Sequence, residues 1–286
     1  MSMGLCFSRV KMIQILFTAG LLVIWAGCTG EKMEEKNATF PSIKDVSEIA
    51  WEKLSKKRIF FGHQSIGNNV IDGMRDVMKE NPAIKLDIVE TRDMEGLRRP
   101  VFAHTHVGKN EDPNSKCEDF TNLIKKGAGD VLDFAALKFC YIDITSATDV
   151  GSVFKSYSNT VSSLKEMKSG MKIIHVTVPL KVVQGGFRAW MKRTLRRPIG
   201  GYSDNIKRAE YNEKVRIEYT GKDPIFDLAR VESTFADGRR CTFLMDGKAY
   251  ESLVPEYTDD GRHLNQKGRR WVAEQFLIFL ANLSTR

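Results

Sequence analysis

The sequence contains few cysteines, and their spacing matches no disulfide framework and no zinc site. The 286 residues include five cysteines, without a CxxC pair, at positions Cys6, Cys28, Cys117, Cys140 and Cys241. Small disulfide-rich domains and structural zinc sites depend on paired cysteines at short, regular spacings. We therefore expect no structural metal ion. One disulfide and one free thiol among Cys117, Cys140 and Cys241 remain an open alternative.

The chain also lacks internal repeats, low-complexity tracts and a strong excess of one charge. Hydrophobic residues make up 42% and charged residues 28% of the sequence, which is ordinary for a globular protein. The net charge of +8 is modest and dispersed, so we expect no nucleic-acid partner. The length is sufficient for one large domain with a full hydrophobic core.

The N terminus has the pattern of a targeting segment. Arg9 and Lys11 precede a long apolar run that ends in Trp25-Ala26-Gly27-Cys28. A charged start, an apolar stretch and small residues are typical of a secretory signal. The last four residues resemble the bacterial lipoprotein cleavage box, in which a cysteine receives lipid, although the box usually has Leu where Trp25 stands.

These observations predict three segments along the chain. A signal peptide is expected over 1–28, a polar tether over 29–45 and the folded domain over 46–286. We expect the protein at the bacterial cell envelope, with Cys28 as the lipid anchor to the membrane, or secreted. An ordinary signal peptide or an uncleaved anchor helix is the alternative interpretation.

In the remaining chain, apolar runs of strand length alternate with helical patterns. This alternation predicts a parallel sheet covered by helices on both faces, with a final amphipathic helix after residue 265. Ligands of such sheets bind at the carboxyl ends of the strands, where the following loops converge. The strands are expected at 58–62, 84–90, 136–144, 172–180 and 224–229.

Two motifs fall at that edge of the predicted sheet. The stretch "FFGHQSIGNNVIDGM" places Ser65 where the first strand turns into a helix, as a nucleophile or as a simple N-cap. The stretch "YTDDGRHLNQKG" places Asp260 and His263 three residues apart, just before the last helix. A serine, a base and a carboxylate that orients the base are the set that nucleophilic hydrolysis requires.

With these residues the chain resembles the SGNH (GDSL-type) hydrolase superfamily over roughly 57–283. The resemblance implies a three-layer α/β/α sandwich, flavodoxin-like, around a central parallel sheet of about five strands. It also implies a serine hydrolase with Ser65 as nucleophile, His263 as base and Asp260 as the acid that orients it. No cofactor is implied. The GxSxG elbow of α/β-hydrolases is not matched, because Gly62 lies three residues before Ser65.

The chain departs from the family pattern at the groups that bind the oxyanion. The usual Gly-Asp-Ser is replaced by Gly62-His63-Gln64-Ser65, without the aspartate. Gly108 is the expected second donor, through its N–H. Where the family has an asparagine after the third strand, this chain has Asp143, which cannot donate a hydrogen bond when ionised. Asn110 or Asn68 is then the expected third donor, or Asp143 has another part, or the oxyanion hole has fewer donors.

The other histidines allow several interpretations. His63 is expected beside Ser65, where it shapes the substrate pocket, supports the base or is structural. His104 and His106 are expected in a loop before Gly108 and contact substrate or are plain polar residues, since no third metal ligand is spaced with them. His175 lies in an apolar strand and is expected to be a buried core histidine.

The sequence thus predicts an esterase that removes an acyl group, such as acetyl, from an envelope or extracellular carbohydrate. The expected partner is a small-molecule or polysaccharide ester; the carbohydrate follows only from the resemblance and the expected location. Two alternatives stay open: a non-catalytic carbohydrate-binding lipoprotein with the same fold, and an acyltransferase that uses the same residues.

Overall fold

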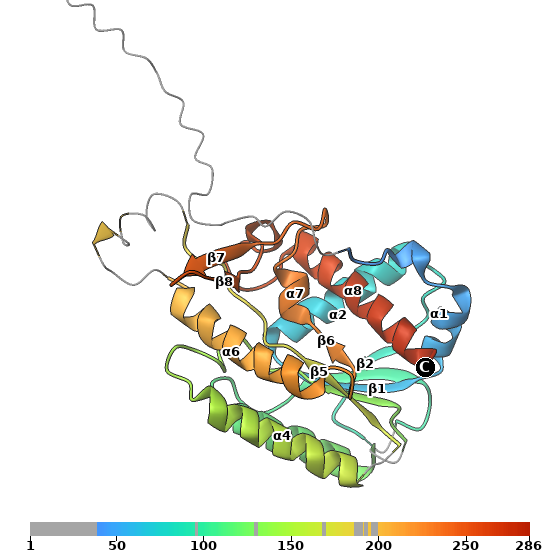
Figure 1. The fold of residues 1–286 in the computed structure, drawn as a ribbon. Coiled ribbons are helices and arrows are strands. Elements are labelled where there is room, and N and C mark those ends of the chain that lie inside the picture. Colours follow the sequence, from blue (N-terminus) through green and yellow to red (C-terminus); the bar gives the residue numbers. More distant parts are fainter. Residues whose placement is uncertain are drawn as a thin grey trace, which may run out of the picture.

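A computed structural model of the chain describes residues 39–94, 97–128, 131–167, 170–185, 191, 194–195 and 200–286. The predicted signal peptide and residues 29–38 of the predicted tether lie outside the described residues. The central sheet has six parallel strands in the order β2-β3-β1-β4-β5-β6 (Figure 1). The strands are β1 (Arg58–His63), β2 (Ile88–Glu90), β3 (Val101–His106), β4 (Phe134–Leu137), β5 (Lys172–Val176) and β6 (Ile225–Phe226).

Helices cover both faces of this sheet, which makes the fold a three-layer α/β/α sandwich (Figure 1). Successive side chains of a strand point to opposite faces, so Phe61 packs in one hydrophobic core and Phe60 in the other. One layer comprises α1 (Glu48–Ser55), α2 (Ser65–Glu80), α7 (Leu228–Glu232) and α8 (Gln266–Ser284); the other comprises α3 (Pro113–Leu123), α4 (Val150–Met167) and α6 (Tyr202–Tyr219).

Smaller elements complete the domain. The antiparallel pair β7 (Thr242–Met245) and β8 (Lys248–Glu251) forms a separate two-stranded sheet that the sequence did not predict. The short helices are η1 (Ile43–Asp45), η2 (Ile124–Ala128) and η3 (Pro255–Tyr257).

The predicted fold class is confirmed, but the sheet has one strand more than the sequence indicated. The missed strand is β3, which was expected to be a loop containing His104 and His106. Both faces of β3 are covered, so its apolar residues do not alternate with polar ones. The two histidines stand on alternate positions of one face, and their polarity concealed the strand pattern.

The residues just before the predicted domain boundary pack on the last helix. The ring of Phe40 lies edge-on to that of Trp271, with 5.3 Å between centroids. The backbone N–H of Ile43 donates to Glu274 at 3.3 Å. The packed part of the chain therefore begins at least as early as Phe40.

The described cysteines Cys117, Cys140 and Cys241 are all buried and free, so the possible disulfide among them is not formed.

Within the described ranges, none of the helices combines the length and apolar character needed to cross a membrane.

Candidate active site

Ser65 is the first residue of α2, one residue beyond the N-cap Gln64 and two beyond the end of β1. This position places it at the carboxyl edge of the sheet, as the sequence predicted. Its side chain is partly exposed, and its Oγ lies 3.9 Å from the Sγ of Cys140. The first N–H groups of a helix lack intrahelical acceptors and carry partial positive charge, which favours a developing anion there.

Asp260 and His263 form a hydrogen-bonded pair in the loop before α8. His263 Nδ1 donates to Asp260 Oδ2 at 2.7 Å, and the His263 backbone N–H donates to Asp260 Oδ1 at 2.8 Å. Gly261 between them has φ 82°, a left-handed conformation that glycine adopts without a steric penalty. With its proton on Nδ1, His263 presents a bare Nε2 that can accept a proton.

The carboxylate of Asp260 is held in its ionised form. Partial burial raises its pKa, but hydrogen bonds from the His263 side chain, the His263 N–H and the Arg262 N–H outweigh burial and hold the pKa well below its usual range. A permanently charged Asp260 orients His263 and stabilises its protonated form.

Two consecutive residues after β4 connect Ser65 with this pair. Cys140 contacts Ser65, and the ring of Tyr141 lies edge-on to the imidazole of His263 with 5.8 Å between centroids. Asn69, one turn after Ser65 on α2, accepts a hydrogen bond from Leu264 N–H at 3.3 Å. The segments that carry the serine and the histidine are therefore fixed against one another.

Tyr141 is itself supported by a buried arginine that the sequence analysis did not identify. Arg208 of α6 donates from Nε to the Tyr141 carbonyl at 2.9 Å, and its guanidinium carbon lies 5.8 Å from the tyrosine ring centroid. The ammonium of Lys181 lies at the same distance from this ring. The sequence signal that could have identified Arg208 is its position three residues before Tyr211, on the apolar side of this helix, because a charge placed there needs fixed partners.

Among the described residues, no hydrogen bond joins Ser65 Oγ to His263; the only polar contact of this hydroxyl is with Cys140. In enzymes without bound substrate such hydrogen bonds are often long and shorten only when substrate binds. The structure thus brings the three predicted residues to one edge of the sheet without a closed serine–histidine contact.

Gly108 does not have the free N–H that the oxyanion prediction requires. Its N–H donates to Asp119 Oδ2 at 2.9 Å. Its φ of 55° and the backbone of Lys116, 2.5 Å from where a Cβ would lie, explain why glycine stands there. Gly108 is therefore explained by close packing of the loop on α3. Asn110 is exposed and its Oδ1 accepts from Lys116 Nζ at 3.1 Å; its role as a donor stays a prediction.

Asp143 is buried and its carboxylate is engaged within the protein, which agrees with the possibility left open in the sequence that it has another part than oxyanion binding. Its carboxylate accepts from Lys116 Nζ at 2.5 Å, Cys140 N–H at 2.6 Å and Glu111 N–H at 2.9 Å. The side chains of Asp143 and Lys116 are both fully buried. This ion pair joins the loop after β3, the helix α3 and the loop after β4.

His63 is buried beneath α2 and does not line a pocket beside Ser65. Its Nδ1 lies 3.1 Å from the Gln64 carbonyl oxygen, and its Nε2 lies 3.0 Å from Nδ1 of His104. Burial lowers the pKa of His63 to about 2 and that of His104 to about 4, so both are neutral. His106 is exposed and contacts Asn68, while His175 is fully buried in β5, as predicted.

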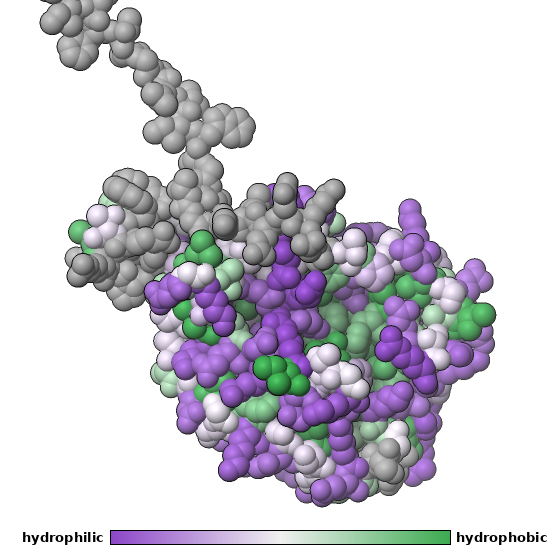
Figure 2. Space-filling view, viewed as in Figure 1, coloured by the Kyte–Doolittle hydropathy of each residue, from purple (hydrophilic) through white to green (hydrophobic). Residues whose placement is uncertain are grey.

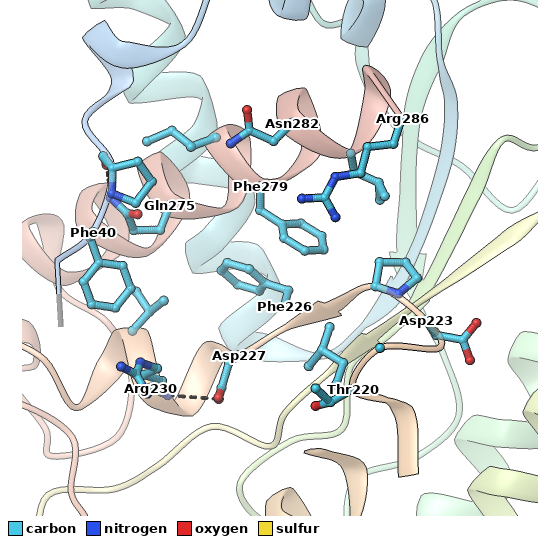
Figure 3. Close-up of a pocket in the computed structure, with 17 residues that line it drawn as sticks. Phe40, Thr220, Asp223, Phe226, Asp227, Arg230, Gln275, Phe279, Asn282 and Arg286 are labelled. Carbon is cyan, nitrogen blue, oxygen red and sulfur yellow. Dashed lines mark hydrogen bonds between the residues drawn. The ribbon is translucent and has the colours of Figure 1, made fainter. Parts of the chain in front are cut away.

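The described part of the chain encloses a cavity but contains no cluster of metal ligands. No three histidine, cysteine, aspartate or glutamate residues there are arranged to hold a metal ion. A cavity of about 520 Å³ lies between β6, α7 and α8, into which Phe40, Phe226 and Phe279 point (Figure 3). Apolar surface gathers near α8 on the same face (Figure 2). None of Ser65, Asp260 and His263 lines the cavity between β6, α7 and α8.

Comparison with known proteins gives the following similarities. No protein-family model matches the sequence, and no curated protein matches it. Similar solved structures include a lipase/acylhydrolase from Enterococcus faecalis, with 12% identity, a TM-score of 0.46 and coverage of 79% of this chain and 96% of that one.

Two further similar structures have comparable scores. One is a carbohydrate esterase family 3 protein from Talaromyces cellulolyticus, with 13% identity, a TM-score of 0.44 and coverage of 79% and 96%. The other is the lipopolysaccharide acetyltransferase periplasmic domain of Salmonella ser. Paratyphi A, with 12% identity, a TM-score of 0.43 and coverage of 76% and 81%.

Proposed function

We propose that this protein is a serine esterase that removes an acyl group, such as acetyl, from an envelope or extracellular carbohydrate. The observation that carries the proposal is the placement of Ser65 and of the Asp260–His263 pair against the consecutive residues Cys140 and Tyr141. The hydrogen bond from His263 Nδ1 to Asp260 leaves Nε2 as the acceptor that a serine nucleophile needs.

In the proposed reaction, Ser65 Oγ attacks the ester carbonyl while His263 Nε2 takes the hydroxyl proton. The Ser65 N–H and the positive end of the α2 dipole stabilise the oxyanion that forms. When the carbon–oxygen bond to the alcohol breaks, His263 returns the proton to the leaving oxygen. A water molecule, deprotonated by His263, then releases the acid and restores Ser65.

The test is hydrolysis of nitrophenyl acetate and of acetylated sugars by the purified chain and by Ser65→Ala. The matched control is Ser162→Ala, a serine on the exposed side of α4. We expect Ser65→Ala to lose the activity with unchanged folding, and Ser162→Ala to keep it. Background rates in all three proteins with both kinds of ester would contradict the proposal and favour a carbohydrate-binding protein. Turnover that requires an acceptor alcohol would identify an acyltransferase.

We also propose that the protein is attached to the bacterial cell envelope through lipid on Cys28. The support is the sequence resemblance of residues 25–28 to a lipoprotein cleavage box. Expression in bacteria with labelled fatty acid is expected to label the protein but not its Cys28→Ala variant. Equal labelling of both, or of neither, would contradict the anchor.

A further inference from the structure

The peptide unit between Gln64 and Ser65 is held by two hydrogen bonds on one side. Its carbonyl oxygen accepts from the Gly67 N–H at 2.6 Å and lies 3.1 Å from His63 Nδ1. A carbonyl oxygen can only accept, so the proton of the neutral His63 ring is on Nδ1. In a trans peptide the C=O and N–H bonds point in opposite directions. Holding the Gln64 carbonyl therefore fixes the direction of the Ser65 N–H.

The tautomer of His63 is fixed in turn by His104. With its proton on Nδ1, His63 offers Nε2 as an acceptor, and His104 Nδ1 donates to it at 3.0 Å. His104 Nε2 is then bare, and it is buried without a hydrogen-bond partner. His63 and His104 are 0% and 3% exposed. The buried imidazoles therefore form a chain with one direction, from His104 through His63 to the Gln64 carbonyl.

The direction of the Ser65 N–H matters because two neighbouring backbone donors at this edge are already engaged. The Gly108 N–H is engaged by Asp119, and the neighbouring Lys109 N–H donates to Ser115 Oγ at 2.9 Å. The buried carboxylate of Asp143 accepts hydrogen bonds from Lys116 Nζ and from the Cys140 and Glu111 N–H groups, so it is engaged as an acceptor. The N–H of Ser65, as the first helical residue, has no intrahelical acceptor.

We infer that His63, held in one tautomer by His104, is a positioning residue that aims the Ser65 N–H at the oxyanion. This inference rests on the proposed esterase function. His63 does not touch the substrate; it acts through the Gln64–Ser65 peptide. Removal of one oxyanion donor typically lowers kcat by about 10²–10³-fold. We expect a misdirected Ser65 N–H to lower kcat in the same way and to leave substrate binding largely intact.

The substitutions that test this role separate the hydrogen bond from the volume of the ring. His63→Leu keeps an apolar side chain but removes the donor. His63→Asn places an amide nitrogen close to where Nδ1 stands and so restores a donor. His175→Leu is the control, because it also removes a buried histidine but lies on β5 and contacts Tyr157 and Tyr219.

Ester hydrolysis by these variants is the first measurement. We expect His63→Leu to lower kcat by about 10²-fold with KM little changed, and His63→Asn to recover most of the loss. His175→Leu is expected to lower thermal stability while kcat stays at the wild-type value. Equal kcat for His63→Leu and the wild type, or no recovery in His63→Asn, would overturn the inference. Wild-type protein without Ser65-dependent turnover would instead contradict the proposed function.

Nuclear magnetic resonance of the full chain tests the geometry without any activity. We expect the proton of the His63 ring on Nδ1, and an amide resonance of Ser65 that shifts in His63→Leu and returns in His63→Asn. If His63→Leu does not fold, His104→Leu is measured instead. This substitution removes the hydrogen bond that fixes the tautomer of His63 and leaves the His63 ring in place. A proton on Nε2 of wild-type His63, or a Ser65 resonance that no variant moves, would overturn the inference.

Discussion

The ring of His63 fills the space that a side chain at Gly67 would occupy. A Cβ on Gly67 would lie 2.2 Å from Cγ of His63. Replacing glycine by alanine inside a helix normally stabilises a protein by about 0.5–1 kcal/mol, but here the ring must move. We therefore expect Gly67→Ala to lower both Tm and kcat, as measured by thermal unfolding and ester hydrolysis.

The control for this substitution is Gly151→Ala, near the start of α4. A Cβ there would meet only Asp149 Oδ1, at 3.3 Å, and the residue is exposed. We expect Gly151→Ala to leave Tm and kcat unchanged or to raise Tm slightly. A Gly67→Ala protein as stable and as active as the wild type would show that the packing of His63 on α2 is not as described.

Asp260→Asn is expected to reduce kcat strongly with a smaller effect on stability. The amide would offer an N–H where the carboxylate accepts from His263 Nδ1, so the imidazole would favour the wrong tautomer. The expected loss in kcat is on the order of 10³–10⁴-fold. Because its pKa lies well below the usual range, Asp260 stays charged as pH falls, and the pH–rate profile should show no ionisation from it near pH 4. A drop of less than tenfold in Asp260→Asn would exclude the orienting role.

Stability is expected to fall as the solution becomes acidic, because three histidines are buried in neutral form. Burial lowers the pKa of His104 and of His175 to about 4, and that of His63 to about 2, from an ordinary value of 6.5. Below pH 6.5 the unfolded chain therefore binds more protons than the folded one. The contribution of the buried histidines to the free energy of unfolding is therefore fully present above pH 6.5. Below that pH it declines, down to about pH 4 for His104 and His175 and further for His63.

Denaturant unfolding at a series of pH values measures this decline. Three histidines together predict a slope of about 3–4 kcal/mol per pH unit between pH 6 and 4.5, before carboxylates contribute. His175→Gln should reduce the slope by about one third, since one of the three groups is removed. A flat free energy of unfolding across this range would refute the neutral, buried state of these rings.

Breaking the ion pair between Lys116 and Asp143 is expected to destabilise the domain severely. Lys116→Met would leave the carboxylate buried with two backbone N–H donors and no counter-charge. Removal of one partner of a buried pair typically costs about 3–5 kcal/mol. Lys56→Ala, which breaks an exposed pair with Glu52, is the control and should have no measurable effect. Similar denaturation midpoints for both variants would contradict the structural role of Asp143.

The sequence predicted the layers of this fold because its apolar runs and helical patterns are local features. It missed β3, since His104 and His106 interrupt a strand whose two faces are both covered. The candidate nucleophile and the Asp260–His263 pair were also visible, because each lies in a short motif at an element boundary.

The oxyanion residues were predicted less well, for a physical reason. Whether a backbone N–H is free depends on tertiary partners, and Asp119 reaches Gly108 from α3, eleven residues along the chain. The pairing of Asp143 with Lys116 likewise joins residues from different loops and helices. Such contacts leave no periodic trace in the sequence, and neither does the hydrogen bond between His63 and His104.

In the proposed reaction, Ser65 is a nucleophile activated by His263. The most direct measurement is intact-mass and peptide mass spectrometry of the full chain after treatment with a fluorophosphonate, which forms a bond between serine Oγ and phosphorus as fluoride leaves. We predict one adduct, on Ser65, that is lost in Ser65→Ala, strongly slowed in His263→Ala and retained in Ser162→Ala. An unlabelled wild-type chain, or an adduct on another residue that Ser65→Ala does not remove, would contradict the account.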